Sequence, residues 1–188
     1  MLTDAERRTL LTIARAAMTA RVVAQAYAPP RGDGALARPQ GAFVTLRRDA
    51  MLRGCVGYTE SVQPLAEIVA RCAAAAATED PRFSPLSEGE LHDVVLEVSV
   101  LGPIEPLGDP GHLELGHHGL IVEEGPRRGL LLPQVATERG WDRPTFLTQT
   151  CVKAGLKPDA WKSGARLFTF QAEVFAEGDY VGTEPTRD

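Results

Sequence analysis

With 188 residues, 44% of them hydrophobic and 24% charged, the chain is long and apolar enough to bury a core that needs no disulfide or metal staple. A net charge of −5 argues against a broad nucleic-acid-binding face, because neutralising phosphates requires clustered Lys and Arg. The basic pairs Arg47-Arg48 and Arg127-Arg128 are too small to form such a face, and both are expected at turns. We therefore predict no nucleic-acid partner.

The cysteine content indicates a reducing compartment. Cys55, Cys72 and Cys151 are odd in number and form no CxxC motif, so a disulfide framework is not expected. Residues 1–8 lack the basic start and apolar run of a signal peptide. No apolar stretch reaches the ~18 residues of a membrane span. We expect a cytoplasmic protein without a membrane partner.

The chain opens with a predicted amphipathic helix. Thr3 and Glu6 have the spacing of a capping box, in which both side chains satisfy free N–H groups at a helix start. The apolar spacing that follows predicts a helix running to about Tyr27. Residues 28–40 are rich in proline and glycine and predict a loop.

A hairpin and a second helix are expected next. Residues 41–58 predict two strands joined near residues 48–50. Ser61 is the expected cap of a helix whose body covers residues 65–78 and includes a run of alanines. Small side chains allow a sheet or another helix to approach closely, so we place this helix in the centre of the core. Asp80-Pro81 is expected to end it, because the residue before proline avoids helical geometry.

The second half of the chain predicts further hairpins and one longer helix. The expected elements are a short capped helix at 87–90, a strand at 94–101, a hairpin of 119–122 with 129–132, a helix at 143–154 closed by Gly155, and a final strand at 167–175. Strands come mostly as hairpins rather than alternating with helices. The fold class is therefore predicted to be α+β, with mainly antiparallel hairpins packed with helices.

Cys55 has an unusual backbone setting. Gly54 and Gly57 flank Cys55 and Val56, which suggests a tight turn or a close backbone approach. In a continuous strand Arg53 and Cys55 share a face, roughly 6.6 Å apart along the strand. A guanidinium beside a thiol favours the nucleophilic thiolate. The alternative is that Cys55 is a small buried hydrophobe at a glycine-tight corner, because free cysteines are often buried. Cys72 and Cys151 lie in predicted helices and are expected to be structural.

Two other groups of residues are candidates for chemistry. A thiol enzyme needs a base, for which His118 or its neighbour His117 is the candidate by residue type. No HExxH or paired CxxC motif is present, so no metal site is predicted. In the turn Asp80-Pro81-Arg82-Phe83, either Arg82 pairs locally at a helix stop, or Arg82 and Phe83 contact a ligand.

Taken in order, six segments resemble the hallmark segments of the AMMECR family. They are Leu52-Arg53-Gly54-Cys55-Val56-Gly57, Asp80-Pro81-Arg82-Phe83, Glu97-Val98-Ser99-Val100-Leu101, Gly129-Leu130-Leu131-Leu132-Pro133-Gln134-Val135, Trp141-Asp142 and Cys151-Val152-Lys153-Ala154-Gly155-Leu156. The first has Val where Ile is commoner, and Ser84 stands where proline often follows the second. That departure weakens the case for a rigid turn. The resemblance covers the chain from about the first helix to Phe175.

The resemblance implies an α+β fold with a larger and a smaller lobe. We expect one AMMECR-type domain over residues 1–188, with the smaller lobe built from parts of about 105–165. The hexapeptide is the expected functional signature, although the family has no settled biochemical activity. Members resemble partners of Memo-like and radical-SAM proteins, which are the partners predicted for this chain. No named cofactor is implied, and none is predicted.

Two functions follow as hypotheses. In the first, the protein is a small-molecule-modifying enzyme or enzyme-associated factor that uses the Cys55 thiolate, with Arg53 and Arg82 holding a small anionic ligand. In the second, it is a non-catalytic ligand-binding or adaptor module, because no acid–base pair or metal motif is recognisable. The hexapeptide would then shape a groove whose contact residues are Arg53, Phe83, Gln134 and Trp141.

Overall fold

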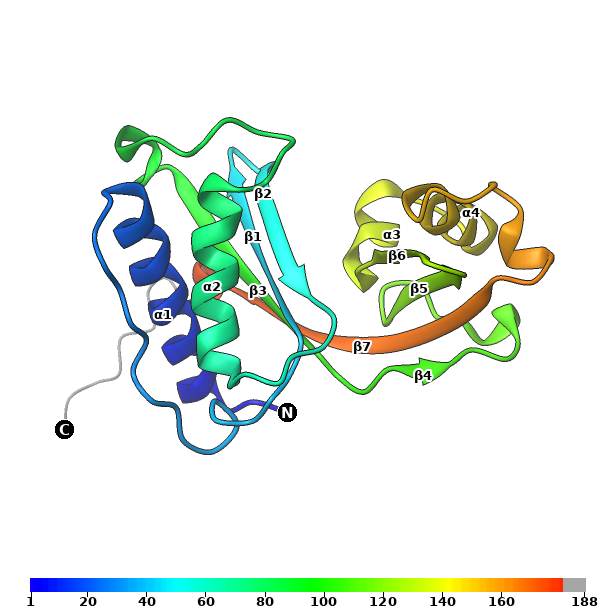
Figure 1. Cartoon of the computed structure of the whole chain (residues 1–188), viewed down its shortest axis with the longest axis horizontal. Coiled ribbons are helices and arrows are strands. Elements are labelled where there is room, and N and C mark those ends of the chain that lie inside the picture. The colour runs from blue at the N-terminus through cyan, green and yellow to red at the C-terminus, as the bar shows by residue number, and fades with distance from the viewer. Residues whose placement is uncertain (181–188) are drawn as a thin grey trace. The chain divides into compact units, whose positions relative to one another are not determined.

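The computed structural model describes residues 1–180 and has helices packed on a mainly antiparallel sheet, so the predicted α+β class is confirmed (Figure 1). Hydrogen-bonded strands follow the order β2-β1-β3-β7-β5-β6, and β4 pairs with β7. The α-helices are α1 (Asp4–Val22), α2 (Leu65–Thr78), α3 (Pro133–Arg139) and α4 (Arg143–Lys153). The strands are β1 (Ala42–Arg48), β2 (Met51–Tyr58), β3 (Val94–Leu101), β4 (Glu105–Pro106), β5 (His118–Glu124), β6 (Arg127–Leu131) and β7 (Arg166–Ala176). Short 3-10 helices are η1 (Glu88–Glu90), η2 (Pro110–His112), η3 (Ala160–Lys162) and η4 (Glu177–Tyr180).

The chain forms two compact units. The first contains Met1–Val100 together with the C-terminal residues from Glu173, and the second is Leu101–Ala172. Each unit has its own hydrophobic core. The assignment of residues 1–188 to a single domain stays a prediction. Within residues 1–180, no helix combines the length and the apolar character needed to cross a membrane.

Helix α1 begins as predicted and ends earlier. The capping box of Thr3 and Glu6 is confirmed, with both reciprocal hydrogen bonds formed. The helix stops at Val22 rather than near Tyr27 because Ala24 adopts a left-handed conformation with φ 55°. The N–H of Gln25 then reaches back to the carbonyl of Ala20 at 2.7 Å, which closes the helix end.

The hairpin of β1 and β2 is confirmed, with its turn at Asp49 and Ala50. Both turn residues have positive φ, 51° and 62°, which matches the type I′ turn that suits the twist of a two-residue hairpin. Arg47 and Arg48 belong to β1 rather than to the turn, and they pair with carboxylates of neighbouring segments. The prediction that they lie at a turn was therefore wrong.

Helix α2 covers the predicted residues, but the predicted cap was wrong. Pro64 occupies the N-cap position, and the Ser61 hydroxyl instead accepts a hydrogen bond from the N–H of Gln63 in a local turn. Figure 1 shows α1 and α2 side by side, and α2 lies on β1 and β2. The alanine run permits this close approach, since Ala73, Ala76 and Ala77 are buried in the first core.

The second unit is built around the hairpin of β5 and β6 and most of β7. Helix α4 packs on β5 and β6, and α3 packs on β5. The cap of α4 by Asp142 is confirmed by a hydrogen bond from the N–H of Thr145. Arg127 and Arg128 were predicted at a turn, yet they lie in β6, because Gly125 and the residue after it make the turn.

Candidate functional site

A β-bulge decides which way Cys55 faces. At the hairpin end Arg48 pairs with Met51, and this register continued without interruption would place Cys55 opposite Val44. Val44 lies in the core under the helices. The register shifts by one residue between Leu46 and Arg47, so that Cys55 pairs with Thr45. Because opposite residues of an antiparallel pair share a face, the Cys55 side chain lies on the sheet face away from α2.

The thiol of Cys55 is partly exposed and has a polar neighbour. The Thr45 hydroxyl lies 3.4 Å from Cys55 Sγ in donor geometry, and Thr45 itself is buried. The next residue across the sheet is Glu97 of β3, which is paired with Arg47 at 3.6 Å. The Glu97 side chain is only 15% exposed. Cys55 therefore belongs to a row of polar side chains across three strands.

Asp80 joins the two segments that carry the sequence motifs. It is buried at the end of α2, and its Oδ2 accepts a hydrogen bond from the N–H of Cys55 at 2.8 Å. The same carboxylate accepts from Arg82 at the backbone N–H (3.1 Å), at Nε (2.9 Å) and at Nη2 (2.7 Å). The Arg82 side chain holds the pKa of Asp80 down to about 2, with the N–H groups of Cys55 and Arg82 adding to the effect against the opposing effect of burial. Asp80 is therefore a charged carboxylate at neutral pH.

Arg82 contacts the Cys55 backbone. Its Nη2 lies 3.4 Å from the Cys55 carbonyl oxygen, and its side chain is 54% exposed. The pKa of Arg82 is raised chiefly by its hydrogen bond to Asp80, and the charges of Asp80 and Cys55 contribute in the same direction. The local pairing expected for this turn is present, and it brings the guanidinium beside the hexapeptide.

The Arg53 guanidinium is engaged by Glu90 and by the Ser84 carbonyl rather than by the Cys55 thiol. Arg53 lies in the bulge, and its Nε donates to Glu90 Oε1 at 2.9 Å while its Nη1 donates to the Ser84 carbonyl at 3.0 Å. Arg53 lowers the pKa of Glu90 to about 2, together with the capping contacts of Ser87. Both arginines lie near the Phe83 ring: the guanidinium carbon is 6.0 Å from the ring centroid for Arg53 and 5.5 Å for Arg82. Arg53 and Phe83 thus anchor the loop that carries Arg82.

The two glycines of the hexapeptide have separate packing reasons. A Cβ on Gly54 would lie 2.2 Å from the carbonyl oxygen of Ala76, so α2 can approach β2 only because this residue has no side chain. A Cβ on Gly57 would lie 2.2 Å from the ring of Phe43. These two glycines were predicted as binding residues, and the structure explains each by packing; a binding role for them stays a prediction.

The remaining cysteines are buried, as predicted. Cys72 and Cys151 are both fully enclosed. Burial raises the pKa of Cys72 to about 12, and burial also raises the pKa of Cys151. At neutral pH both are neutral thiols packed among apolar side chains. Cys55 is the cysteine with an exposed part.

Three predicted site residues belong to the second unit, whereas Cys55 belongs to the first. His118 Nδ1 accepts a hydrogen bond from the N–H of Glu114 at 3.1 Å, so the neutral ring carries its proton on Nε2 and offers a donor there rather than a base. Gln134 lies in the first turn of α3, and its carbonyl accepts from Thr137. Trp141 packs against the second core just before α4. In residues 1–180 no three potential metal ligands gather into a cluster.

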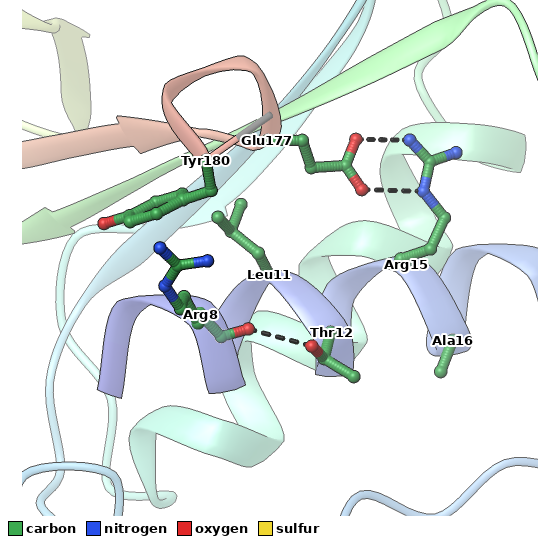
Figure 2. A pocket seen from close by; sticks show the side chains of 7 residues that line it. All are labelled: Arg8, Leu11, Thr12, Arg15, Ala16, Glu177 and Tyr180. Atoms are coloured by element: carbon green, nitrogen blue, oxygen red, sulfur yellow. Dashed lines mark hydrogen bonds and ion pairs between the residues drawn. The ribbon is translucent and has the colours of Figure 1, made fainter. Parts of the chain in front are cut away.

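A separate hollow of about 550 Å³ lies in the first unit over α1 and η4 (Figure 2). Figure 2 shows the Arg15 guanidinium bound to the Glu177 carboxylate through two contacts, and Arg8 lying beside the Tyr180 ring. The guanidinium carbon of Arg8 is 4.3 Å from the centroid of that ring. Arg15 also donates to the carbonyls of Leu91 and Val94 at 2.9 and 2.8 Å. These contacts hold η4 and the start of β3 against α1. We therefore interpret the residues around the hollow as structural and assign them no ligand.

Sequence reasoning missed the contribution of Thr45, Asp80 and Glu90 to the site. Local pairing of Arg82 at the helix stop was one of the two predicted alternatives, but the hydrogen bond that Asp80 accepts from the N–H of Cys55, 25 residues away, was not predicted. Thr45 could have been found only from the bulged register. The pairing of Glu90 with Arg53 joins residues 37 positions apart, and no local signal indicates it.

The arrangement has two chemical resources. One is a partly exposed thiol that receives a hydroxyl hydrogen bond, and the other is an exposed guanidinium held next to the thiol-bearing backbone. A positive charge near a thiol favours the thiolate, and a guanidinium edge can bind a carboxylate or phosphate.

Comparison with known proteins assigns the chain to a family. A family model described as AMMECR1 matches residues 11–175. A protein of Methanothermobacter thermautotrophicus is 46% identical over 92% of this chain and 94% of its own, and one of Aeropyrum pernix is 44% identical over 100% and 85%. The crystal structure of an uncharacterised protein from Pyrococcus horikoshii is similar with a TM-score of 0.84, at 40% identity over 89% of each chain. The conserved length and the level of identity leave one assignment: the chain belongs to the AMMECR1 family.

Proposed function

We propose that this protein is a cytoplasmic small-molecule-modifying enzyme or enzyme-associated factor whose reactive group is the thiol of Cys55. The observation that carries the proposal is the carboxylate of Asp80, which binds both the Cys55 backbone and the Arg82 guanidinium. Cys72 and Cys151, by contrast, are sealed in the cores. The accessible thiol is thus the one that has a hydroxyl beside it and a guanidinium next to its own backbone carbonyl.

In this proposal Arg82, rather than Arg53, receives the anionic group of the ligand. Arg53 already donates to Glu90 and to the Ser84 carbonyl, and its side chain is only 15% exposed. Arg82 is more than half exposed, and its bonds to Asp80 use Nε and Nη2. His118 has no part in the proposal, because its Nδ1 already accepts a backbone hydrogen bond.

Thiol alkylation tests the reactive group directly. Iodoacetamide at about pH 8 should label the native protein once, at Cys55, because the neutral thiols of Cys72 and Cys151 are enclosed and are poor nucleophiles. Unfolding in guanidinium chloride should expose all three cysteines to the reagent. Peptide mass spectrometry identifies the labelled site. An unlabelled Cys55 in the native protein would make it a packing residue and remove the basis of the proposal.

The proposed partners are Memo-like and radical-SAM proteins. Cys55→Ala and Cys55→Ser should abolish whatever activity a reconstituted system of these proteins gains from this chain. Asp33→Asn, a change at an exposed aspartate of the loop before β1, is the control. Full activity of both Cys55 variants would show that the thiol is dispensable.

A second candidate function is a non-catalytic ligand-binding or adaptor module. The observation in its favour is that Gly54, Gly57 and Arg53 each have a packing or pairing task, so most of the hexapeptide is explained without chemistry. This candidate predicts that Cys55→Ser leaves binding to a purified Memo-like or radical-SAM protein unchanged, whereas Arg82→Glu weakens it. Isothermal titration calorimetry with protein at tens of micromolar would measure both. Absence of binding by the unmodified chain would count against the adaptor.

A further inference from the structure

Four hydrogen bonds converge on one carboxylate in the first unit. Asp80 Oδ1 accepts from the N–H and Nε of Arg82, while Oδ2 accepts from Nη2 of Arg82 and from the N–H of Cys55. Two side-chain bonds to the two carboxylate oxygens fix the plane of the guanidinium, since a fork-to-fork pair has only one good geometry. The carboxylate side chain is 3% exposed, so it is a fixed support rather than a mobile surface group.

The fixed guanidinium leaves one edge for a ligand. Within residues 1–180, Nη1 is the Arg82 nitrogen that has no hydrogen-bond partner, and the side chain is 54% exposed. Nη2 also contacts the Cys55 carbonyl at 3.4 Å, which keeps the guanidinium beside the residue that carries the thiol. A carboxylate or phosphate bound at Nη1 would therefore be held beside the residue that carries the thiol.

We propose that Asp80 is the positioning residue of the Cys55 site, and that by aiming Arg82 it makes the site selective for electrophiles that carry a carboxylate or phosphate. This inference rests on the proposed function of Cys55 as the reactive thiol. Asp80 does not touch the ligand. It acts through Arg82, and its own negative charge opposes the binding of an anion.

Two alkylating reagents of nearly equal size give the test. Iodoacetate and iodoacetamide react with a thiolate in the same way: the sulfur forms a bond to the CH₂ carbon, and iodide leaves with the electron pair of the carbon–iodine bond. Only iodoacetate carries a carboxylate. The measured quantity is the ratio of their rates at Cys55, followed by peptide mass spectrometry and divided by the same ratio for a free small thiol.

In the unmodified protein the rate ratio of iodoacetate to iodoacetamide at Cys55 should be about three or more times the ratio for the free thiol, because a fixed guanidinium recruits the carboxylate. Asp80→Asn should lower the ratio toward that of the free thiol, since a neutral amide has one acceptor oxygen and cannot accept from both Nε and Nη2 of Arg82. Charge alone predicts the opposite sign, because the variant has one negative charge fewer near the site. Asp33→Asn makes the same charge change in the loop before β1 and should leave the ratio unchanged.

Arg82→Lys provides a second variant that does not alter the buried carboxylate. It keeps the positive charge but lacks the planar fork, and we expect the same loss of preference for iodoacetate. Circular dichroism tests whether each variant is folded. If Asp80→Asn does not fold, the rate ratio of Arg82→Lys is the deciding measurement. A ratio that stays at or above the unmodified value in the folded variant overturns the inference while leaving Cys55 reactive. No reaction of Cys55 with either reagent in the unmodified protein overturns the proposed function and the inference together.

Discussion

The backbone N–H of Cys55 donates to Oδ2 of Asp80 at 2.8 Å, although 25 residues separate the two in the chain. Strand β2 is the last strand in the hydrogen-bonded order, so the N–H and carbonyl of Cys55 would otherwise form part of an open sheet edge. The N–H is satisfied by Asp80, and the carbonyl is contacted by Arg82 at 3.4 Å. The turn after α2 therefore supplies, at this one position, the hydrogen-bond partners that a further strand would provide.

Acid should destabilise the protein partly through Asp80. Its pKa is lowered in the folded state from an ordinary 3.8 to about 2, chiefly by Arg82. A lowered folded-state pKa adds stability above the unfolded pKa, and this contribution is lost as the pH falls through the folded one. Asp80 should thus contribute about 2 kcal/mol near pH 6, which disappears between about pH 5 and pH 2.

The check is urea unfolding as a function of pH for the unmodified chain and for Asp80→Asn. The difference in unfolding free energy between them should shrink by about 2 kcal/mol across that interval. Asp33→Asn, at an exposed loop position, serves as the reference for a change of charge alone. A difference that stays constant with pH would mean that the carboxylate is not preferentially stabilised in the folded protein.

Gly54→Ala should be the most damaging small substitution in the hexapeptide. The added Cβ would meet the backbone carbonyl oxygen of Ala76 at 2.2 Å, and the helix cannot retreat without disturbing the first core. We expect a loss of about 2–3 kcal/mol in unfolding free energy. Gly57→Ala should also destabilise the protein, because its Cβ would lie 2.2 Å from the Phe43 ring and 2.6 Å from the backbone carbonyl oxygen of Ala42; the ring can rotate, so we expect a smaller cost than at Gly54.

Gly108→Ala provides the control in thermal and urea unfolding. No atom lies within 4 Å of a Cβ at that position, so its effect should stay within about 0.5 kcal/mol. Equal costs at positions 54 and 108 would contradict the packing explanation for the hexapeptide glycine.

The elements of the first unit could be predicted because their signals are local. A capping box, an alternating strand pattern and a proline after the helix end each act within a few residues, and the structure confirms Thr3 with Glu6 and the strand at Val94–Leu101. The wrong prediction of where α1 ends also has a local cause. Ala24 ends α1 by adopting positive φ, which few non-glycine residues do, so the apolar pattern beyond it was misleading.

The surroundings of Cys55 could not be predicted, because they depend on a single extra residue. One bulge shifts the pairing partner of Cys55 from Val44 to Thr45, and a shift of one residue moves a side chain to the other face of a sheet. The same bulge carries Arg53, whose partner Glu90 comes from a segment beyond α2. Tertiary pairing of this kind leaves no periodic signal in the sequence.

Ala50→Gly should stabilise the hairpin that carries the site. Ala50 has φ 62°, where a Cβ is strained, and glycine is favoured at this position of a type I′ turn. We expect a gain of about 0.5–1 kcal/mol, the released strain exceeding the greater freedom of glycine in the unfolded chain. Ala16→Gly, inside α1, should change stability in the opposite direction by about 1 kcal/mol. Thermal unfolding of the two variants gives the signs, and a loss at position 50 would contradict the turn type.

The ion pair of Arg53 and Glu90 should couple more strongly than an exposed pair of equal length. Both side chains are less than one-fifth exposed, and the Nε to Oε1 distance is 2.9 Å. Arg21 and Glu79 are also 2.9 Å apart, but their side chains are 50% and 58% exposed. Double-mutant cycles to alanine should give a coupling energy of about 1–2 kcal/mol for the first pair and less than about 0.5 kcal/mol for the second, because water screens exposed charges. The cycle cancels the separate role of Glu90 in capping η1 at Ser87, so the coupling reports the pair alone. Equal coupling in the two cycles would mean that Arg53 is free to leave Glu90, and the anion-binding role predicted for Arg53 from the sequence would regain its basis.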